Sequence, residues 1–524
     1  MSSRKSFAQK TAQFIWLMVR RPSEARAVAL NALFSEEKEL DKDPSAGFDR
    51  ASMRRCWELL DLTSRSFATV IKELDGDLCR VVCLFYLVGR GVDTIEDDMT
   101  IDVDTKVQLL ETFHEKLSTP GWTFNGNGPA EKDRQLLVEY DNVISELMAL
   151  DESYRTVITR ICRSMGHGMA HYVRLASTSK SSYAVSSLHE YDLYCHFVAG
   201  LVGEGVSALF SASGKEMPEL GKMLTLSNSM GLMLQKTNIT RDFREDLDQG
   251  RFFWPQEIWG KFADNPRTFF ENSDAETQQK ALWALSEQIL DALVHSIDCL
   301  DYLSLLKNQS VFNFCSIPQV MAIATLELCF MNPKVFKGNV KIRKSLALQL
   351  IQRSTNTREV ASIFVDYTRR LLRKASPADP SFIKLCIITG QIEQWTENRY
   401  PSWVFQQGRI RSPIPQYRDD PDAQGITDAR IRQLPLRKDA MQQDGQAVGK
   451  YKPEQGNKLE KEDWLVLGSI IGGIVAAMFV MMGAVAFVIW YATRDDPPSF
   501  FNNLFGSKGE LDSVGSSSSG KIEL

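Results

Sequence analysis

Two short acidic stretches of the chain share one spacing, Asp-x-x-Glu-Asp. The first is DTIEDD at 93–98, shortly after the apolar run VVCLFYLVGR, and the second is DFRED at 242–246. Side chains at positions i, i+3 and i+4 of a helix lie on one face. The spacing therefore predicts two clusters of three carboxylates: Asp93, Glu96 and Asp97, and Asp242, Glu245 and Asp246.

Clustered carboxylates favour a bound cation. Two like charges ~5.5 Å apart repel by about 3 kcal/mol at an effective dielectric constant of ~20. Such a cluster must stay solvated, hold protons or bind cations. Oxygen ligands suit Mg²⁺, which takes one or two carboxylates together with substrate phosphate oxygens. A merely solvated helix face is the alternative, and the second copy of the spacing disfavours it.

Arginines accompany both acidic motifs. Arg90 lies three residues before Asp93, Arg241 directly precedes the second motif, and Arg251 follows it. They could be salt-bridge partners, but metal ions and arginines facing one cleft suit a diphosphate, because both neutralise a departing phosphate group. The stretches CLFYLVGR, YCHFVAGLVG and GLMLQKTNIT supply apolar and aromatic walls. This combination indicates an isoprenoid diphosphate as substrate.

Composition limits the class of protein. The chain has 524 residues, 44% hydrophobic and 24% charged, which suits one large domain or two ordinary ones. A net charge of −5 gives no support for nucleic-acid binding. The nine cysteines are odd in number and lack a C-x-x-C pair, so we expect reduced core cysteines in a cytosolic compartment.

One segment near the C-terminus predicts a membrane anchor. The run 465–491 carries no charge, and 27 helical residues span ~40 Å, enough to cross a ~30 Å hydrocarbon core. Aromatic residues lie at both ends, Trp464 and Tyr491 among them. Four lysines lie in the fifteen residues before the span, against one basic residue in the fifteen after it. This asymmetry predicts a cytosolic N-terminal part and a tail across the membrane.

The rest of the chain reads as helical. Apolar stripes with a 3.6-residue period run through 131–150 and 282–303, and no series of alternating strands is present. We expect a single large all-α domain. Residues 401–463, between this domain and the apolar span, carry six of the nineteen prolines of the chain, which is typical of a flexible tether. The expected organisation is an N-terminal segment 1–29, the domain 30–400, the tether 401–463, the transmembrane helix 464–491 and a polar tail 492–524.

Seven stretches resemble squalene synthases, the farnesyl-diphosphate farnesyltransferases of sterol synthesis. They are LTSRSFA, DTIEDD, YCHFVAGLVGEG, QKTNITRDFRED, GRFFWPQEIW, VFNFCSIPQVMAIATLELC and VFKGNVKIRK. The resemblance covers roughly residues 50–400. It implies a class I isoprenoid-synthase helical domain with a central cavity, a monomeric catalytic domain, and a single-pass endoplasmic-reticulum anchor that leaves the tail in the lumen.

The resemblance also implies the reaction. Two molecules of farnesyl diphosphate are condensed with Mg²⁺ to presqualene diphosphate, which is then reduced to squalene with NADPH. The metal ligands are the six carboxylates named above. The catalytic positions are Tyr194, Arg65 and Phe314.

Binding positions follow from the same resemblance. The substrate-binding residues are Ser64, Ser66, Phe67, Tyr86, Arg90, Gln235, Asn238, Arg241 and Arg251. The residues that contact the NADPH phosphates are Arg65, Arg90, Arg241, Lys341 and Arg343. The sequence has no strand–G-x-G-x-x-G–helix unit, so the dinucleotide must bind a helical surface.

Two alternatives remain open at this point. A phytoene or dehydrosqualene synthase would share the carboxylates and the tyrosine without the reduction. A tail-anchored, acidic metal-binding scaffold protein would use the carboxylates only structurally. Consumption of farnesyl diphosphate with Mg²⁺, and the products formed with and without NADPH, distinguish the three.

Overall fold

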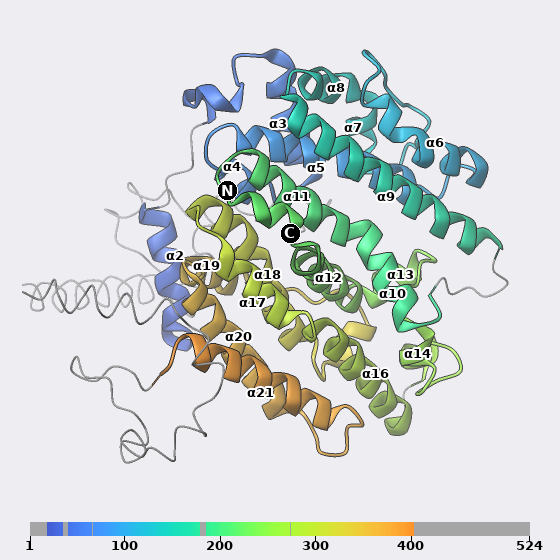
Figure 1. Ribbon diagram of the computed structural model, residues 1–524. Helices are drawn as coiled ribbons and strands as arrows, with labels where there is room; N and C mark the ends of the chain where they lie inside the picture. The colour runs from blue at the N-terminus through green and yellow to red at the C-terminus, as the bar shows by residue number, and fades with distance from the viewer. Residues whose placement is uncertain (1–17, 35–39, 65–66, 179–184, 273, 403–524) are drawn as a thin grey trace, which may run out of the picture. The chain divides into compact units, whose positions relative to one another are not determined.

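The described part of the chain is helical throughout. The computed structural model describes residues 18–34, 40–64, 67–178, 185–272 and 274–402 (Figure 1). No strand is present in these ranges. The α-helices are α2 (Pro22–Phe34), α3 (Ala51–Thr63), α4 (Phe67–Lys72), α5 (Leu78–Asp97), α6 (Val103–Lys116), α7 (Arg134–Val138), α8 (Tyr140–Met148), α9 (Glu152–Thr178), α10 (Leu188–Cys195), α11 (Leu201–Ala212), α12 (Leu224–Arg241), α13 (Phe243–Asp248), α14 (Gln256–Trp259), α15 (Thr268–Glu271), α16 (Ala275–Leu293), α17 (Ser296–Leu305), α18 (Gln309–Cys329), α19 (Lys344–Arg353), α20 (Thr357–Lys374) and α21 (Phe382–Arg399).

Short helical segments connect some of these elements. A π-helical segment, η3 (His196–Gly200), joins α10 to α11. The 3₁₀ segments are η1 (Leu40–Lys42), η2 (Pro44–Ala46), η4 (Pro218–Lys222) and η5 (Pro333–Phe336). The all-α prediction is therefore confirmed for the described residues. Packing divides the chain after Gln407, and only the first unit contains described residues.

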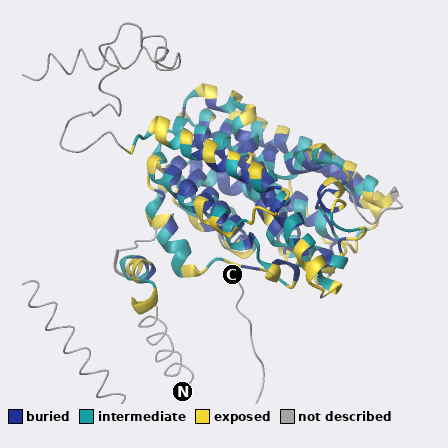
Figure 2. Ribbon diagram, turned by 90° about the horizontal axis from the view of Figure 1, so that it is seen from below, coloured by how far each residue is buried: buried dark blue, intermediate teal, exposed yellow. Residues whose placement is uncertain are grey.

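The core lies between helices that are distant in the sequence. Helix α12 packs against η3, α11, α16, α17 and α18, and α5 packs against α3, α9 and α11. Buried residues concentrate on the inward faces of these helices, whereas exposed residues lie on the outer faces (Figure 2). The first acidic motif forms the end of α5 and the second follows α12, so the packing of these two helices determines how the motifs meet.

Glycines allow α12 to approach the η3–α11 segment closely. A Cβ atom on Gly231 would lie 2.2 Å from the carbonyl oxygen of Ala199, and one on Gly203 would lie 2.1 Å from that of Ser227. Because no larger residue fits at either contact without a backbone shift, the glycines fix the separation of the two helices. Both glycines also line the cavity described below.

The last residue of the first acidic stretch has a structural role. Asp98 ends α5 with an extended backbone (φ −72°, ψ 101°). Its carboxylate accepts hydrogen bonds from the backbone N–H groups of Thr100 and Gly128, both at 2.9 Å, and from Asn127. Burial opposes the charge, yet these donors lower the pKa of Asp98 to about 2. The fourth carboxylate of DTIEDD thus closes the helix end and leaves three for the site.

Two apolar stripes of the sequence are each divided between two helices in the structure. The stripe through 131–150 is not one helix, because α7 and α8 are separated at Glu139 (φ −113°, ψ 28°), whose carboxylate pairs with Arg55. The stripe through 282–303 is likewise divided between α16 and α17. An apolar stripe continues in the sequence across a helix break of only one or two residues, so the stripe alone does not reveal the break. The predicted domain start at residue 30 lies inside α2, which packs on α19.

Two described segments, Leu188–Ala212 and Gln309–Cys329, are long and apolar enough to cross a membrane. Residues from both line the central cavity, which accounts for their apolar character. The predicted transmembrane helix, tether and tail lie outside the described residues. None of the nine cysteines, all of which lie in the described ranges, forms a disulfide, and eight are buried, as expected for core cysteines.

Candidate active site

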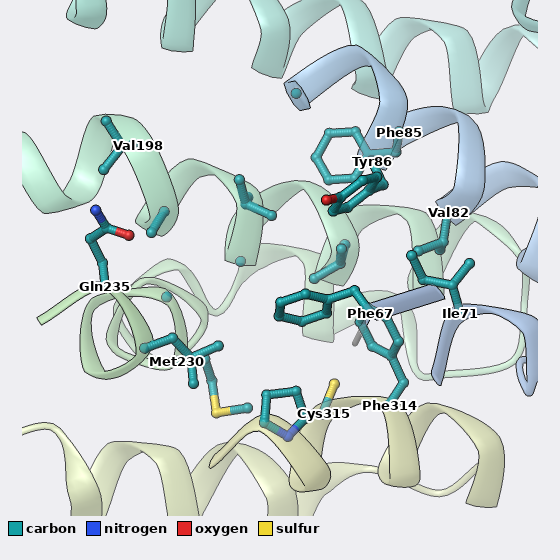
Figure 3. Close-up of a pocket in the computed structure, with 18 of the residues that line it drawn as sticks. Phe67, Ile71, Val82, Phe85, Tyr86, Val198, Met230, Gln235, Phe314 and Cys315 are labelled. Carbon is teal, nitrogen blue, oxygen red and sulfur yellow. The ribbon is translucent and has the colours of Figure 1, made fainter. Parts of the chain in front are cut away.

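A central cavity of about 270 Å³ lies between the core helices, with side chains from α4, α5, α9, η3, α11, α12, α17 and α18 in its wall (Figure 3). Along α5 it extends from Val82 to Asp93, which is ~16 Å at ~1.5 Å per residue. Most of the lining is apolar. The cavity contains seven of the predicted site residues: Phe67, Tyr86, Arg90, Asp93, Gln235, Asn238 and Phe314.

The first acidic motif occupies the last turn of α5, where the cavity becomes polar. Arg90 Nη1 lies 3.6 Å from Asp93 Oδ2. Burial raises the pKa of Asp93 to about 6. Burial and the neighbouring carboxylates of Asp97 and Asp93 raise the pKa of Glu96 to about 8. The three predicted carboxylates therefore share one helix turn, and Glu96 holds its proton near neutral pH.

The second motif lies at a junction between two helices. Asp242 ends α12 and begins α13 (φ −94°, ψ 12°), so the three carboxylates do not lie on one continuous helix as predicted. The turn is nevertheless maintained, because Asp246 N donates to Asp242 O at 2.9 Å. Asp242 N donates to Asn238 O at 2.8 Å, which connects the motif directly to a residue that lines the cavity.

Each carboxylate of the second motif has a specific partner. Arg241 Nε donates to Asp242 Oδ1 at 2.7 Å, and Asn339 Nδ2 donates to Glu245 Oε2 at 3.0 Å. Burial raises the pKa of Asp246 to about 7, with further contributions from the Asp242 and Glu245 carboxylates. The sequence had not singled out Asn339, although it belongs to the stretch VFKGNVKIRK.

Arg251 joins the two motifs. Its Nη1 donates to Asp97 of α5, and its Nη2 lies 3.6 Å from Asp246 Oδ1 of α13. This position is consistent with the predicted place of Arg251 in the site. The sequence alone did not indicate that one guanidinium would lie between the two sets of carboxylates.

The donor set is compatible with Mg²⁺. Within the described ranges, no three Asp, Glu, His or Cys side chains are already close enough to hold a metal ion together. The two facing motifs provide only oxygen donors, several with raised pKa values, and an arginine side chain lies between them. In this structure, protons and the Arg251 guanidinium balance the negative charge of these carboxylates. A hard divalent cation bound between the motifs could take over that role.

Tyr194 lies beside the first motif, with 6% of its surface exposed. Its ring stacks on Phe253 at 4.9 Å and 13° and meets Tyr172 edge-on at 5.1 Å. Burial, with the nearby charges of Glu96 and Asp97, raises the pKa of Tyr194 well above its usual value. The phenol is therefore protonated at neutral pH and close to the carboxylates.

Helix α12 is held from behind by a buried lysine that the sequence analysis missed. Lys236 Nζ lies 2.6 Å from Asp192 Oδ1 of α10 and 2.7 Å from Asp291 Oδ2 of α16, and its side chain is 1% exposed. Burial opposes its charge, but the two aspartates outweigh this effect and raise the pKa of Lys236. The adjacent Gln235 consequently faces the cavity from a helix anchored on its opposite side.

The predicted site residues between α3 and α4 are partly described. Ser64 ends α3, and its hydroxyl accepts from Phe67 N at 3.2 Å. Tyr86 accepts from Arg90 Nη2 at 3.0 Å and donates to Thr63 O at 3.3 Å. Phe67 of α4 and Phe314 of α18 both line the cavity (Figure 3). The predicted residues Arg65 and Ser66 lie outside the described residues.

The predicted cofactor residues Lys341 and Arg343 do not line the cavity. Both are exposed residues in the segment that precedes α19. Asn339, two residues before Lys341, is bonded to Glu245, so this segment is joined to the second acidic motif. The Arg343 guanidinium is bonded to Glu24 of α2, a contact that the sequence did not predict.

Comparisons with known proteins agree with this geometry. The family model described as squalene/phytoene synthase matches residues 60–345. The chain is 52% identical to the squalene synthase of Ganoderma lucidum over 403 residues, which cover 75% of this chain and 86% of that protein. The chain belongs to the squalene synthase family. The family predicted from the motifs is thereby confirmed, and the scaffold-protein alternative is wrong.

Other members of the squalene synthase family give the same result. The squalene synthase of Schizosaccharomyces pombe is 50% identical over 361 residues, 68% of this chain and 78% of that protein. A solved structure of TcSQS with the ligand BPH1237 is 40% identical and superimposes with a TM-score of 0.62. The superposition covers 67% of this chain and 99% of the TcSQS chain, so the isoprenoid-synthase fold makes up nearly the whole of that relative.

Proposed function

We propose that this squalene synthase family member condenses two molecules of farnesyl diphosphate to presqualene diphosphate and reduces that product to squalene, with Mg²⁺ and NADPH. The observation that carries the proposal is the apolar cavity whose polar end meets two facing Asp-x-x-Glu-Asp motifs. An extended apolar cavity suits a prenyl chain, and a carboxylate- and arginine-rich end suits its diphosphate.

The six motif carboxylates would hold the magnesium ions, and the three arginines would contact the diphosphate. Bound Mg²⁺ neutralises charge on the departing diphosphate. Arg90 and Arg251 already lie among the carboxylates and carry donors suited to phosphate oxygens. Arg241, paired with Asp242, would contribute from the second motif.

Tyr194 would act on the carbocation and its protons. Its hydroxyl stays protonated at neutral pH, so it can donate a hydrogen bond or a proton beside the first motif. Aromatic faces stabilise nearby positive charge, and the stacked pair of Tyr194 and Phe253 presents such a surface. Phe314 would line the region in which the prenyl chains rearrange.

The segment before α19 would bind the phosphates of NADPH, which supplies the hydride. Lys341 and Arg343 provide the cations, and the Asn339–Glu245 hydrogen bond supports a location beside the second motif. Arg65, Arg90 and Arg241 would contribute to the same phosphates. Mutating Lys341 and Arg343 together to alanine should raise the apparent NADPH constant ~100-fold, since each charge-assisted contact contributes about 1.5–3 kcal/mol.

The enzyme would be anchored in the endoplasmic reticulum membrane by residues 464–491, with the domain in the cytosol and the tail in the lumen. The uncharged run and the lysines before it support this topology. A chain ending after Arg399 should partition into the soluble fraction and remain active. Retention of that shortened chain in salt-washed membranes would point to another membrane contact.

Product analysis tests the proposal directly. The full-length enzyme is incubated with radiolabelled farnesyl diphosphate and Mg²⁺, with NADPH supplied or withheld. Presqualene diphosphate should accumulate without NADPH, and squalene should form with it. Formation of dehydrosqualene or phytoene-type products under both conditions would contradict the reductive half of the proposal. An unchanged substrate would contradict both halves.

A further inference from the structure

Helix α2 from the N-terminal region packs on the helix that follows the proposed cofactor segment. Figure 1 shows α2 beside α19, although about 300 residues separate them in the sequence. Two sets of side-chain hydrogen bonds join the helices. Gln352 Nε2 donates to Ala27 O at 2.9 Å, and Glu24 reaches the residues at the start of α19.

Glu24 is the centre of this second contact. Its carboxylate accepts from Arg343 Nη2 at 2.7 Å and Nε at 3.3 Å, and from Ser345 Oγ at 2.7 Å. Arg21 Nη1 adds a contact at 3.2 Å. The Glu24 side chain is 5% exposed, whereas that of Arg343 is 45% exposed. The carboxylate is therefore the inner partner, and the guanidinium extends from it toward solvent.

Glu24 is held in its charged form. Burial raises its pKa, but hydrogen bonds from Arg343 and Ser345 outweigh burial and keep the pKa of Glu24 below its usual value. The carboxylate binds the Nε–Nη2 edge of the guanidinium, which fixes the plane of that group. Among the described residues, Nη1 of Arg343 donates to no other group.

We propose that Glu24 is a positioning residue for the cofactor site, which holds the Arg343 guanidinium so that its remaining N–H groups face a phosphate of NADPH. The inference rests on the proposed function, which assigns Arg343 to that phosphate. A long arginine side chain loses much rotamer freedom when it binds an anion, so an arginine fixed in advance binds more tightly. The N-terminal helix thereby contributes to the reductive half-reaction without touching substrate.

The test measures NADPH dependence in Glu24→Gln of the full-length enzyme. The apparent KM for NADPH should rise about tenfold, which corresponds to about 1.4 kcal/mol. The kcat at saturating NADPH and the rate of presqualene diphosphate formation without NADPH should stay unchanged. In an Arg343→Ala background, Glu24→Gln should have no further effect on the KM, because the group that it orients is gone.

Two further variants keep the test independent of folding. Gln352→Ala removes the hydrogen bond from Gln352 to Ala27 of α2 without touching Arg343, and it should leave the NADPH KM unchanged. Ser345→Ala removes one donor to the Glu24 carboxylate and should raise the KM about twofold to threefold. If Glu24→Gln is poorly folded by its melting temperature, Ser345→Ala measured against Gln352→Ala decides the question.

The outcomes separate this inference from the proposed function. If Arg343→Ala leaves the NADPH KM unchanged, the assigned cofactor site is wrong. If Arg343→Ala raises the KM but Glu24→Gln leaves it unchanged or lowers it, Glu24 does not position Arg343, and a lower KM would mean that the two anions compete. An equal rise in Gln352→Ala would trace the effect to loosening of α2 and overturn the specific role of Glu24.

Discussion

The two acidic motifs have the same spacing but different settings. The first lies in the last turn of the unbroken helix α5, and burial raises the pKa of Asp93 to about 6 and of Glu96 to about 8. The second lies where α12 gives way to α13, and each of its carboxylates has a cationic or amide partner. Identical spacing in the sequence therefore produces one motif on an unbroken helix with two raised pKa values, and one at a helix junction with a single raised value, that of Asp246.

This difference suggests a division of labour. Glu96 on α5, with its pKa raised to about 8, must release a proton when a cation arrives, which makes the first motif the more sensitive to pH above neutrality. The second motif is attached to the cofactor segment through the Asn339–Glu245 hydrogen bond. It therefore connects the diphosphate end of the cavity to the region proposed for NADPH.

The largest effect should come from removing one oxygen ligand of either motif. Asp93→Asn and Asp242→Asn should each lower squalene formation about 10³-fold, because the loss of a cation that stabilises the leaving diphosphate costs about 4 kcal/mol. The assay is turnover of farnesyl diphosphate at saturating Mg²⁺. Asp248→Asn is the matched control: Asp248 lies on α13 after the motif and pairs with Arg244, which is not one of the predicted ligands. Activity above a tenth of wild type in either motif variant would contradict the metal assignment.

The tyrosine beside the first motif should have the next largest effect. Tyr194→Phe keeps the ring that stacks on Phe253 and removes the hydroxyl, so the protein should fold normally and lose ~10²-fold in presqualene diphosphate formation. Tyr191→Phe is a useful control, since its hydroxyl is buried and accepts a hydrogen bond from Gln288 at 2.7 Å. A wild-type rate of the first half-reaction in Tyr194→Phe would show that the hydroxyl has no role in it.

The comparison predicts a pH dependence of the Mg²⁺ requirement. The raised pKa values of Asp93, Glu96 and Asp246 (about 6, 8 and 7) mean that these groups gain protons as the pH falls from 8 to 6. Because Mg²⁺ binds the ionised form, its apparent affinity should fall by about tenfold per pH unit for each proton displaced. Initial rates across Mg²⁺ concentrations at several pH values measure this.

Two conservative variants assign the protons to their motifs. Glu96→Gln should flatten the dependence between pH 7 and 8, and Asp246→Asn should flatten it around pH 7. Equal apparent Mg²⁺ constants at pH 6 and pH 8 in the unmodified enzyme would show that these carboxylates do not bind the metal as protonated groups.

The sequence predicted the helical class and the locations of both motifs, because local spacing and apolar periodicity determine them. It could not predict which cation meets which carboxylate. Arg251 and Asp97 are 154 residues apart, and Arg343 and Glu24 are 319 apart, so these pairs depend on how whole helices pack. Lys236 was missed for the same reason: within its own helix it resembles any surface lysine, and only the positions of α10 and α16 make it buried.

The smallest effect tests the connection that only the second motif has to the cofactor segment. Asn339→Ala removes the hydrogen bond to Glu245, which contributes about 1.5 kcal/mol as a bond to a charged group, and this corresponds to about tenfold. Since Asn339 is exposed, solvent replaces part of that bond, so we expect about a threefold loss. The loss should fall on NADPH-dependent squalene formation, while presqualene diphosphate forms at the normal rate, because the first half-reaction needs no cofactor.

Asn339→Asp sharpens this last test, because it places a second negative charge against Glu245. It should push the segment away from the motif and lower squalene formation more than the alanine variant does. Asn332→Ala is the control, since Asn332 caps the short turn η5 upstream of the same loop by accepting a hydrogen bond from Lys334 N at 3.1 Å. Equal slowing of both half-reactions in Asn339→Asp would mean that Asn339 supports the metal site itself. The second motif would then be no more closely tied to the reduction than the first, and the proposed division between them would fail.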